Sequence, residues 1–312
     1  MDTATLDYEL PPELIAQQPA ARRDASRLLV YRSDSGAVEH RVFSELPELL
    51  AGELVVLNDT RVVPARLRLQ RATGGFVEIL LVEQVEDGLW EALVRPARRL
   101  RRGERLGPAE LLRPLGDGRW LVRHQGIPAG EVPLPPYIRA PLHEPERYQT
   151  VFAEADGSAA APTAGLHFTR ELLGLLDHVS VTLHVGLDTF RPVKAERLED
   201  HELHGERYRV DPEAWGRIAD ATRVLAVGTT SVRVLETVVR TGELAGRTSL
   251  FITPGFEFRS VDALLTNFHL PRSTLLALVM AFAGVEKTRE LYRTAVRESY
   301  RFYSFGDAML VL

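Results

Sequence analysis

The chain has 312 residues, of which 45% are hydrophobic and 26% charged, and its formal net charge is −5. This composition is typical of a globular protein of about two domains, and the acidic balance excludes a wholly basic wrapper of nucleic acid. The absence of cysteine excludes disulfides, thiolate metal sites and a thiol nucleophile. The longest apolar run, Leu275 to Gly284, is about half of a bilayer span, and the first residues show no signal-peptide pattern. We therefore expect no membrane segment and a cytoplasmic location.

The hydrophobic pattern changes near residue 65. Before that point, Pro12 to Gln17 predicts a short helix. From about 65 to 130, short strands alternate with Gly, Pro and Asp-Gly turn signals, which predicts a β-barrel-like unit poor in helix. A proline-rich segment at 132–137 then predicts an extended linker. The strands predicted up to this linker cover residues 27–31, 54–57, 76–82 and 89–95.

The barrel-like region carries a concentrated positive charge. From Arg95 to Arg123 there are nine arginines against three acidic residues, which gives a local charge of +6. A basic patch on an acidic protein is typical of a surface that contacts a phosphate backbone. The same arginines also fit a set of solvated turns on a small β domain, and this alternative stays open.

The pattern becomes α/β beyond residue 165. Residues 179–185 alternate apolar and polar side chains, which predicts a strand with His184 on its polar face. The apolar run 223–227 predicts a buried parallel strand, followed by a turn and a helix over 231–240. A strand, a small polar turn and a helix in this order place ligands at the carboxyl end of a sheet. A further strand is predicted at 250–252, an element leading to Thr266 at 263–265 and a final strand at 308–312, with further helices at 274–282, capped by Ser273, and 286–300.

Four polar segments follow hydrophobic elements, at 161–168, 184–186, 228–231 and 266–269. Their small residues let a backbone approach a ligand, and their Thr, Asn and His side chains can exchange hydrogen bonds or protons. The turn at Gly228 offers amide donors to a phosphate or carboxylate, although it is not a P-loop, and a plain capped helix start is the alternative. Asn267 and the segment Asn58 to Arg61 fit either ligand recognition or a structural turn.

A histidine-rich segment contains His201, His204 and Glu206. The histidines are three residues apart rather than four, and Gly205 weakens a helix there, so the zinc motif His-Glu-x-x-His is not met. A metal pair and plain surface residues stay open as alternatives. We favour acid–base or hydrogen-bonding groups and expect no metal. A Gly-x-Ser-x-Gly elbow for a serine nucleophile is absent from the sequence.

Eight motifs run in order along nearly the whole chain and together resemble one known family. They cover residues 58–67, 133–138, 161–168, 182–186, 201–206, 228–233, 266–271 and 303–309. The sequence is similar to the S-adenosylmethionine:tRNA ribosyltransferase-isomerase family of queuosine biosynthesis. The resemblance implies a multi-domain α/β fold, in which an α/β domain with a mixed sheet is interrupted by a smaller β-barrel domain. We place the α/β catalytic domain at 1–64 plus 150–312 and the inserted barrel, with its arginine-rich patch, at 65–149.

The resemblance also implies a reaction. A transferase of this family moves and isomerises the ribosyl part of S-adenosylmethionine onto 7-aminomethyl-7-deazaguanine at the wobble position of a tRNA anticodon. The products are epoxyqueuosine-tRNA, adenine and methionine. The implied partners are the precursor tRNA and S-adenosylmethionine, which is a substrate, so no bound cofactor is expected. We expect no membrane partner and a monomer.

This chemistry needs a base and an acid. A proton leaves the carbon beside the sulfonium, adenine is protonated as it departs, and without cysteine the histidines and carboxylates are the candidates. The candidate catalytic residues are His167, His184, His201, His204, Glu206 and His269. The candidate substrate-binding residues are Asn58, Asp59, Arg61, Thr163, Gly165, Gly186, Thr189, Gly228, Thr229, Thr230, Arg233, Asn267 and Phe268. Among these, Arg233 is expected to hold a carboxylate or phosphate, and Phe268 to stack on a base.

The chain departs from the family pattern in three places. Asp188 stands where the family has a second glycine after His184, and the chain is shorter before Pro133 and between Arg240 and Thr248. A carboxylate at residue 188 changes the charge beside the expected sulfonium site. Two other functions stay open, a noncatalytic RNA-binding protein and an S-adenosylmethionine-dependent RNA methyltransferase.

Overall fold

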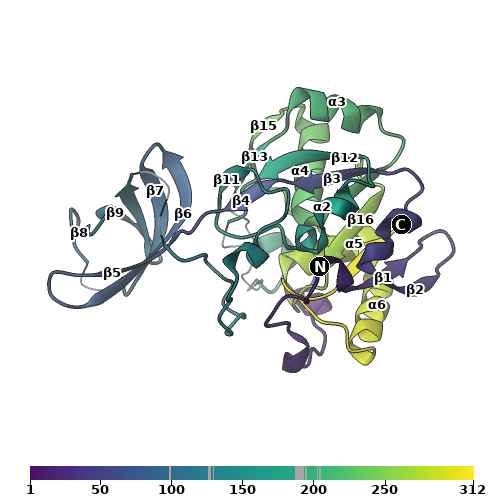
Figure 1. The fold of residues 1–312 in the computed structure, drawn as a ribbon, viewed down its shortest axis with the longest axis horizontal. Coiled ribbons are helices and arrows are strands. Elements are labelled where there is room, and N and C mark those ends of the chain that lie inside the picture. Colours follow the sequence, from purple (N-terminus) through teal and green to yellow (C-terminus); the bar gives the residue numbers. More distant parts are fainter. Residues whose placement is uncertain are drawn as a thin grey trace.

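The strands of the chain form one large mixed sheet, one smaller antiparallel sheet and a two-stranded pair. A computed structural model describes residues 1–97, 100–125, 128, 130–186, 193, 195–201, 203 and 205–312. Figure 1 shows the smaller sheet at the left, set apart from the α/β body that holds both chain termini. The multi-domain α/β fold expected from the sequence is confirmed, while the domain boundaries at 64/65 and 149/150 stay predictions.

The large sheet has nine strands in the order β15 (Ala245–Thr248), β13 (Glu206–Arg209), β12 (His178–Leu183), β3 (Leu54–Asn58), β14 (Val224–Val227), β16 (Ala263–Asn267), β17 (Ala308–Val311), β1 (Arg27–Tyr31) and β2 (Val38–Val42). Strands β12, β3, β14 and β16 are parallel neighbours, so their carboxyl ends meet at one edge. Strand β17 runs antiparallel to β16 and brings the start of β1 to the same edge. The polar segments that follow these strands are thereby gathered on one side of the sheet.

Helices cover both faces of the large sheet because its central strands are apolar on both sides. The helices are α1 (Leu46–Leu49), α2 (Arg170–Leu173), α3 (Pro212–Asp220), α4 (Gly228–Thr241), α5 (Thr274–Ala283) and α6 (Val285–Arg297). Along β3, Val56 packs with α4, α5 and α6, whereas Val55 and Leu57 pack with α1 and α2. Short 3-10 helices lie at Thr3–Leu6, Pro12–Leu14, Arg23–Ala25, Phe43–Glu45, Pro145–Tyr148, Thr163–His167 and Leu198–Asp200.

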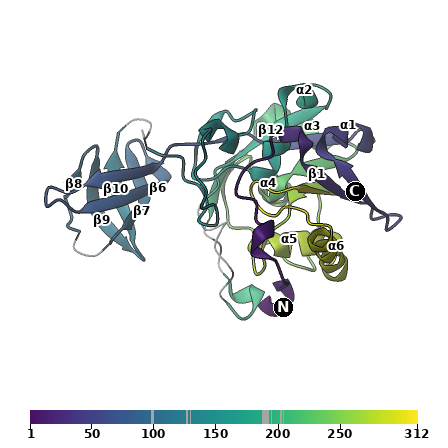
Figure 2. The same ribbon diagram turned by 60° about the horizontal axis from the view of Figure 1, so that its bottom comes forward.

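The smaller sheet is antiparallel and curved (Figure 2), and it has its own apolar core around Trp90 and Trp120. Its order is β5 (Arg66–Gln70), β6 (Phe76–Glu86), β7 (Leu89–Arg95), β10 (Arg119–His124), β9 (Ala109–Gly116) and β8 (Arg105–Leu106). The pair of β4 (Thr60–Val62) with β11 (Ala155–Ser158) lies where the chain leaves and re-enters the α/β body. The barrel-like sheet expected after residue 65 is confirmed.

Some local predictions were wrong. Leu250 to Ile252 does not form a strand; the edge strand is β15, and the apolar run after it lines a cavity instead. Pro12 to Gln17 shortens to a 3-10 turn at Pro12–Leu14. Helix α4 starts at Gly228 rather than at residue 231, and Gly228 has a φ of 83°, which a glycine adopts without strain.

The nine arginines of the basic region have different environments. Arg119 and Arg123 form ion pairs of 2.8 Å with Glu91 and Glu110. The exposed members are Arg95, Arg101, Arg102, Arg105, Arg113 and Arg123, while Arg98 and Arg99 lie outside the described residues. The proposed phosphate-contacting surface thus keeps several exposed guanidinium groups, and its role stays a prediction.

Candidate functional site

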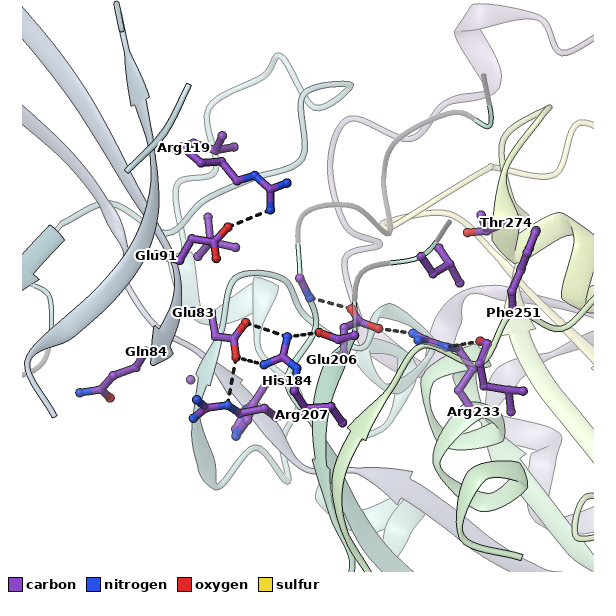
Figure 3. A pocket seen from close by; sticks show the side chains of 18 of the residues that line it. Glu83, Gln84, Glu91, Arg119, His184, Glu206, Arg207, Arg233, Phe251 and Thr274 are labelled. Atoms are coloured by element: carbon purple, nitrogen blue, oxygen red, sulfur yellow. Dashed lines mark hydrogen bonds and ion pairs between the residues drawn. The ribbon is translucent and has the colours of Figure 1, made fainter. Parts of the chain in front are cut away.

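A cleft of about 450 Å³ lies between the two sheets (Figure 3). Strands β6 and β7 of the smaller sheet form one wall, and β13, α4, α5 and the segment after β12 in the α/β body form the other. The second wall contains four residues selected from the sequence: His184, Gly186, Glu206 and Arg233. Leu275, Leu278 and Phe251 add apolar surface. Its size and mixture of apolar and polar lining are those of a small-molecule site.

His184 follows β12 directly and is held from two sides. Its Nδ1 lies 2.9 Å from the hydroxyl of Thr60. Gly157 lies against the imidazole and leaves little room for a side chain, because a Cβ at that position would be 3.1 Å from Cε1 of the ring. Burial, reinforced by the charge of Arg207, lowers the pKa of His184 below its ordinary value. A neutral, fixed imidazole at the cleft wall can accept a proton at neutral pH.

Glu206 and Arg233 form a buried ion pair beside His184. The Glu206 carboxylate accepts hydrogen bonds from the Arg233 guanidinium and, at 2.8 Å, from the backbone N–H of Gly186. Arg233 also donates to the carbonyl oxygens of Leu250 and Thr248, each at 3.1 Å. Both side chains are only 10% exposed. Their contacts join β13, α4 and the segment after β15 into one rigid wall.

An ion-pair cluster joins the two sheets across one end of the cleft. Glu83 on β6 accepts from Arg207 on β13 at 2.9 Å and from Arg247 on β15. Arg207 also donates to the carbonyl oxygen of Val85 at 3.2 Å. Figure 3 shows Glu83 next to Arg207, close to His184 and Glu206. Because these ion pairs connect separate sheets, they set how closely the two walls approach.

Replacing Glu83 with Gln is expected to loosen the contact between the sheets. Both pairs share Glu83 and are partly exposed, so together they contribute about 1 kcal/mol. We therefore expect cleavage by a protease at residues 63–65 and 132–136 to become up to about fivefold faster, with little change in overall stability. Glu86→Gln, on the same strand and also at the cleft, is the matched control. Equal cleavage rates in wild type and Glu83→Gln would show that these pairs do not hold the sheets together.

His167 and Asn267 lie together at the carboxyl edge of the large sheet but outside the cleft lining. Nδ1 of His167 is 2.7 Å from the Ser26 hydroxyl, and its Nε2 is 3.2 Å from Nδ2 of Asn267. The imidazole stacks on Phe43 with ring centroids 4.9 Å apart. Asn267 also donates to the carbonyl oxygen of Tyr303 at 3.0 Å. These contacts connect the starts of β1 and β17 to the end of β16.

His269 and Phe268 lie inside the protein. Nε2 of His269 is 2.9 Å from the Thr266 hydroxyl. Phe268 has no exposed surface, and its ring packs against Tyr292, Tyr300 and Phe302 at centroid distances of 5.1 to 5.5 Å. Stacking of Phe268 on a base therefore requires that these rings move.

Asn58, Asp59 and Arg61 contact the backbone and side chains around His184 through hydrogen bonds and an ion pair. Asn58 exchanges two hydrogen bonds, of 3.0 and 3.1 Å, with the backbone of Leu183. Asp59 accepts from Thr182 at 2.7 Å, and burial raises the pKa of its carboxyl group. Arg61 lies 3.7 Å from Asp156, which lines the cleft.

The remaining candidates are not among the residues that line the cleft, or they lie outside the described residues. A Cβ at Gly165 would come within 2.7 Å of the Phe152 ring, so this glycine is required by packing. Thr229 and Thr230 are buried at the start of α4, and Thr163 is half-buried. His201 packs edge-on against Phe251 at 5.6 Å. Thr189, His204 and the departure at Asp188 lie outside the described residues.

The two buried histidines predict a loss of stability in acid. Burial lowers the pKa of both His167 and His269 to about 3. Because the folded pKa lies below the unfolded value of about 6.5, their contribution is complete above pH 6.5 and is lost as the pH falls towards 3. Each contributes a slope of about 1.4 kcal/mol per pH unit in that window.

Urea unfolding between pH 6 and pH 4 measures this effect. His269→Gln is expected to flatten the dependence of the unfolding free energy on pH by about 1.4 kcal/mol per unit. The exposed His143 provides the control, and His143→Gln should keep the wild-type slope. Parallel slopes for His269→Gln and wild type would contradict burial of a neutral imidazole.

Neither a metal centre nor a membrane span is found in the part of the chain that the structure describes. Within those residues, groups of three or more His, Cys, Asp or Glu side chains with metal-binding geometry are absent. The helices there are also too short or too polar to cross a bilayer.

The chain is similar to named proteins along its whole length. A family model described as queuosine biosynthesis protein matches residues 3–311. A Rubrobacter xylanophilus protein named S-adenosylmethionine:tRNA ribosyltransferase-isomerase is 55% identical, over 100% of this chain and 98% of its own. A Thermotoga maritima protein of the same name is 50% identical, with both chains covered completely.

A solved structure agrees with this relationship. The crystal structure of S-adenosylmethionine tRNA ribosyltransferase from Thermotoga maritima matches with a TM-score of 0.59 and 40% identity, over 99% of this chain and 100% of that one. The resemblance carried by the eight motifs is therefore confirmed, and the chain belongs to the queuosine biosynthesis protein family.

Proposed function

We propose that this chain is an S-adenosylmethionine:tRNA ribosyltransferase-isomerase. It transfers and isomerises the ribosyl part of S-adenosylmethionine onto 7-aminomethyl-7-deazaguanine in the tRNA wobble position, giving epoxyqueuosine-tRNA, adenine and methionine. Relatives with this name share 50% to 55% of their residues with this chain over its full length. S-adenosylmethionine is consumed as a substrate, so the reaction needs no resident cofactor. The enzyme acts as a cytoplasmic monomer.

The cleft between the sheets is the proposed reaction site. The observation that carries this proposal is the meeting of His184, Gly186, Glu206 and Arg233 on one wall of a cavity of about 450 Å³. These residues come from separate segments of the sequence and include both a proton acceptor and a rigid anionic group. The cavity is large enough for a nucleoside-sized ligand.

The cleft walls suit a cationic substrate. Among the described residues, six acidic side chains line the cleft against four arginines, so its lining is negative on balance even though Glu83 and Glu91 are paired with arginines. Carboxylates near a cation lower its energy, so this lining favours the sulfonium of S-adenosylmethionine and a protonated aminomethyl group. His184 removes the proton from the carbon beside the sulfonium, and Glu206 keeps the Gly186 loop against the substrate.

Product analysis tests the reaction. With S-adenosylmethionine and tRNA that carries the 7-deazaguanine precursor, the enzyme should release adenine and methionine in equal amounts. The control tRNA has an unmodified guanine at the wobble position and should give neither product. S-adenosylhomocysteine as the product would instead identify a methyltransferase, and binding of tRNA without release of a small molecule would identify a noncatalytic RNA-binding protein.

A further inference from the structure

A second cavity is lined in part by His167 and shares no lining residue with the cleft. We call it the arginine cavity, because the guanidinium groups of Arg23, Arg147 and Arg301 line it. Ser26, His167 and Ser304 complete its polar surface. Its lining comes from the segments before β1, around Pro145–Tyr148 and before β17.

Positive charge at the arginine cavity is only partly balanced. Arg301 pairs with Asp307 at 3.3 Å, and the Asp307 carboxylate also accepts a hydrogen bond from the backbone N–H of Arg27. Arg23 donates to the carbonyl oxygens of Leu166 and Glu146, which are neutral groups. The Glu146 carboxylate, whose charge acts on Arg23, is exposed, and the neighbouring Asp24 is paired with Arg22. Three cations therefore face one buried and one exposed carboxylate.

The guanidinium groups are held in place before any ligand arrives. Arg147 donates to the carbonyl oxygens of Ala20 and Ala21, at 2.5 and 3.2 Å, while its Nε is buried without a hydrogen-bond partner. Arg23 and Arg301 lie close enough to His167 for their charges to lower its pKa further than burial alone. Fixed cations beside a buried imidazole form a preorganised positive site, which favours an anion.

The size of the arginine cavity limits the ligand. Its volume of about 20 Å³ holds one or two water molecules. This space admits the oxygens of an anionic group but not a base or a sugar ring. The rest of such a ligand must lie outside, against the half-buried arginine side chains.

We propose that the arginine cavity binds a backbone phosphate of the RNA substrate. The inference rests on the proposed tRNA substrate and adds a contact point apart from the reaction cleft. A phosphodiester presents two anionic oxygens on a chain that stays on the surface, which matches the shape of the site. Guanidinium groups recognise phosphate oxygens through paired hydrogen bonds.

The salt dependence of tRNA binding tests this site. For each phosphate contact that is lost, the slope of log Kd against log salt concentration falls by about 0.7 to 0.9. We expect Arg147→Gln to lose one contact, and Arg147→Lys, which keeps the charge, to retain most of the slope. Arg301→Gln is a second variant with the same expected change, should Arg147→Gln fail to fold. Arg217→Gln is the control, because Arg217 also donates to a carbonyl oxygen but lies on α3.

A small anion gives an independent readout. Inorganic phosphate at millimolar concentration should raise the Tm of the wild type and of Arg217→Gln, but not that of Arg147→Gln. Unchanged salt slopes in both folded Gln variants would overturn the proposal, as would a selective loss of S-adenosylmethionine affinity, which would assign the site to the methionine carboxylate. If ribosyl transfer is absent but the slopes fall as expected, the proposed reaction fails and the phosphate site stands.

Discussion

Replacing His184 with Gln is expected to lower kcat for ribosyl transfer by at least about 100-fold, the usual contribution of a positioned general base. Among the residues that the structure describes, His184 is the histidine lining the cleft, with Nδ1 on Thr60 and the imidazole against Gly157. Gln keeps a polar side chain of similar size but cannot accept the proton. Adenine release under saturating substrates measures kcat directly.

His178 is the matched control for this variant. It is the first residue of β12, the strand that His184 follows, and its Nδ1 is 3.0 Å from the carbonyl oxygen of Leu176. His178→Gln should keep wild-type turnover and a similar Tm. Near-wild-type turnover in folded His184→Gln would move the proton transfer to another group.

Replacing Arg233 with Met is expected to reduce the free energy of unfolding by about 3 to 5 kcal/mol. The side chains of Arg233 and Glu206 are each 10% exposed, so removing the cation deprives a buried carboxylate of its paired charge, while the backbone N–H of Gly186 still donates to it. It also removes the donors that hold the carbonyl oxygens of Thr248 and Leu250. Urea unfolding monitored by tryptophan fluorescence measures the change.

Two further variants separate the ion pair from general loss of packing. Arg233→Met combined with Glu206→Leu should recover part of the lost stability, because the buried charge is gone. Arg217→Met breaks a partly exposed pair with Asp177 and should cost about 1 kcal/mol or less. A loss for Arg233→Met as small as that for Arg217→Met would contradict a buried, structurally important pair.

The sequence predicted the elements whose hydrophobic period is clear. Strand β12 alternates along its length, and helix α5 follows a serine cap whose hydroxyl accepts the N–H of Leu276 at 3.2 Å. The strand predicted at Leu250 to Ile252 was wrong because a short apolar segment fits a strand and a cavity wall equally well. In the structure, the Arg233 guanidinium donates a hydrogen bond to the carbonyl oxygen of Leu250, and this long-range contact places the segment in the cavity wall.

The candidate site was predictable on one wall and not on the other. His184, Gly186, Glu206 and Arg233 belong to motifs with unusual spacing, and the large sheet brings these motifs to one edge. On the opposite wall, Glu83 is a partly exposed charged residue of β6, and its partners Arg207 and Arg247 are exposed residues of β13 and β15 with no distinctive motif around them. Their meeting depends on how the two sheets lie against each other, which local sequence patterns do not encode.

Local sequence patterns also did not predict which of the candidate residues are buried. Phe268 follows the same strand as Asn267, yet its ring enters an aromatic cluster formed by α6 and the segment before β17. Gly165 belongs to a segment typical of binding loops, but the Phe152 ring occupies the space beside it. Long-range packing decides both outcomes, so the roles assigned to these residues stay predictions.

Dual labelling of S-adenosylmethionine tests the central claim most directly. With ¹⁴C in the ribose and ³H in the methyl group, the enzyme should attach ¹⁴C to precursor tRNA while ³H leaves with methionine, and His184→Gln should abolish most of the ¹⁴C transfer. Transfer of ³H to the RNA, or RNA without either label, would contradict ribosyl transfer in the cleft.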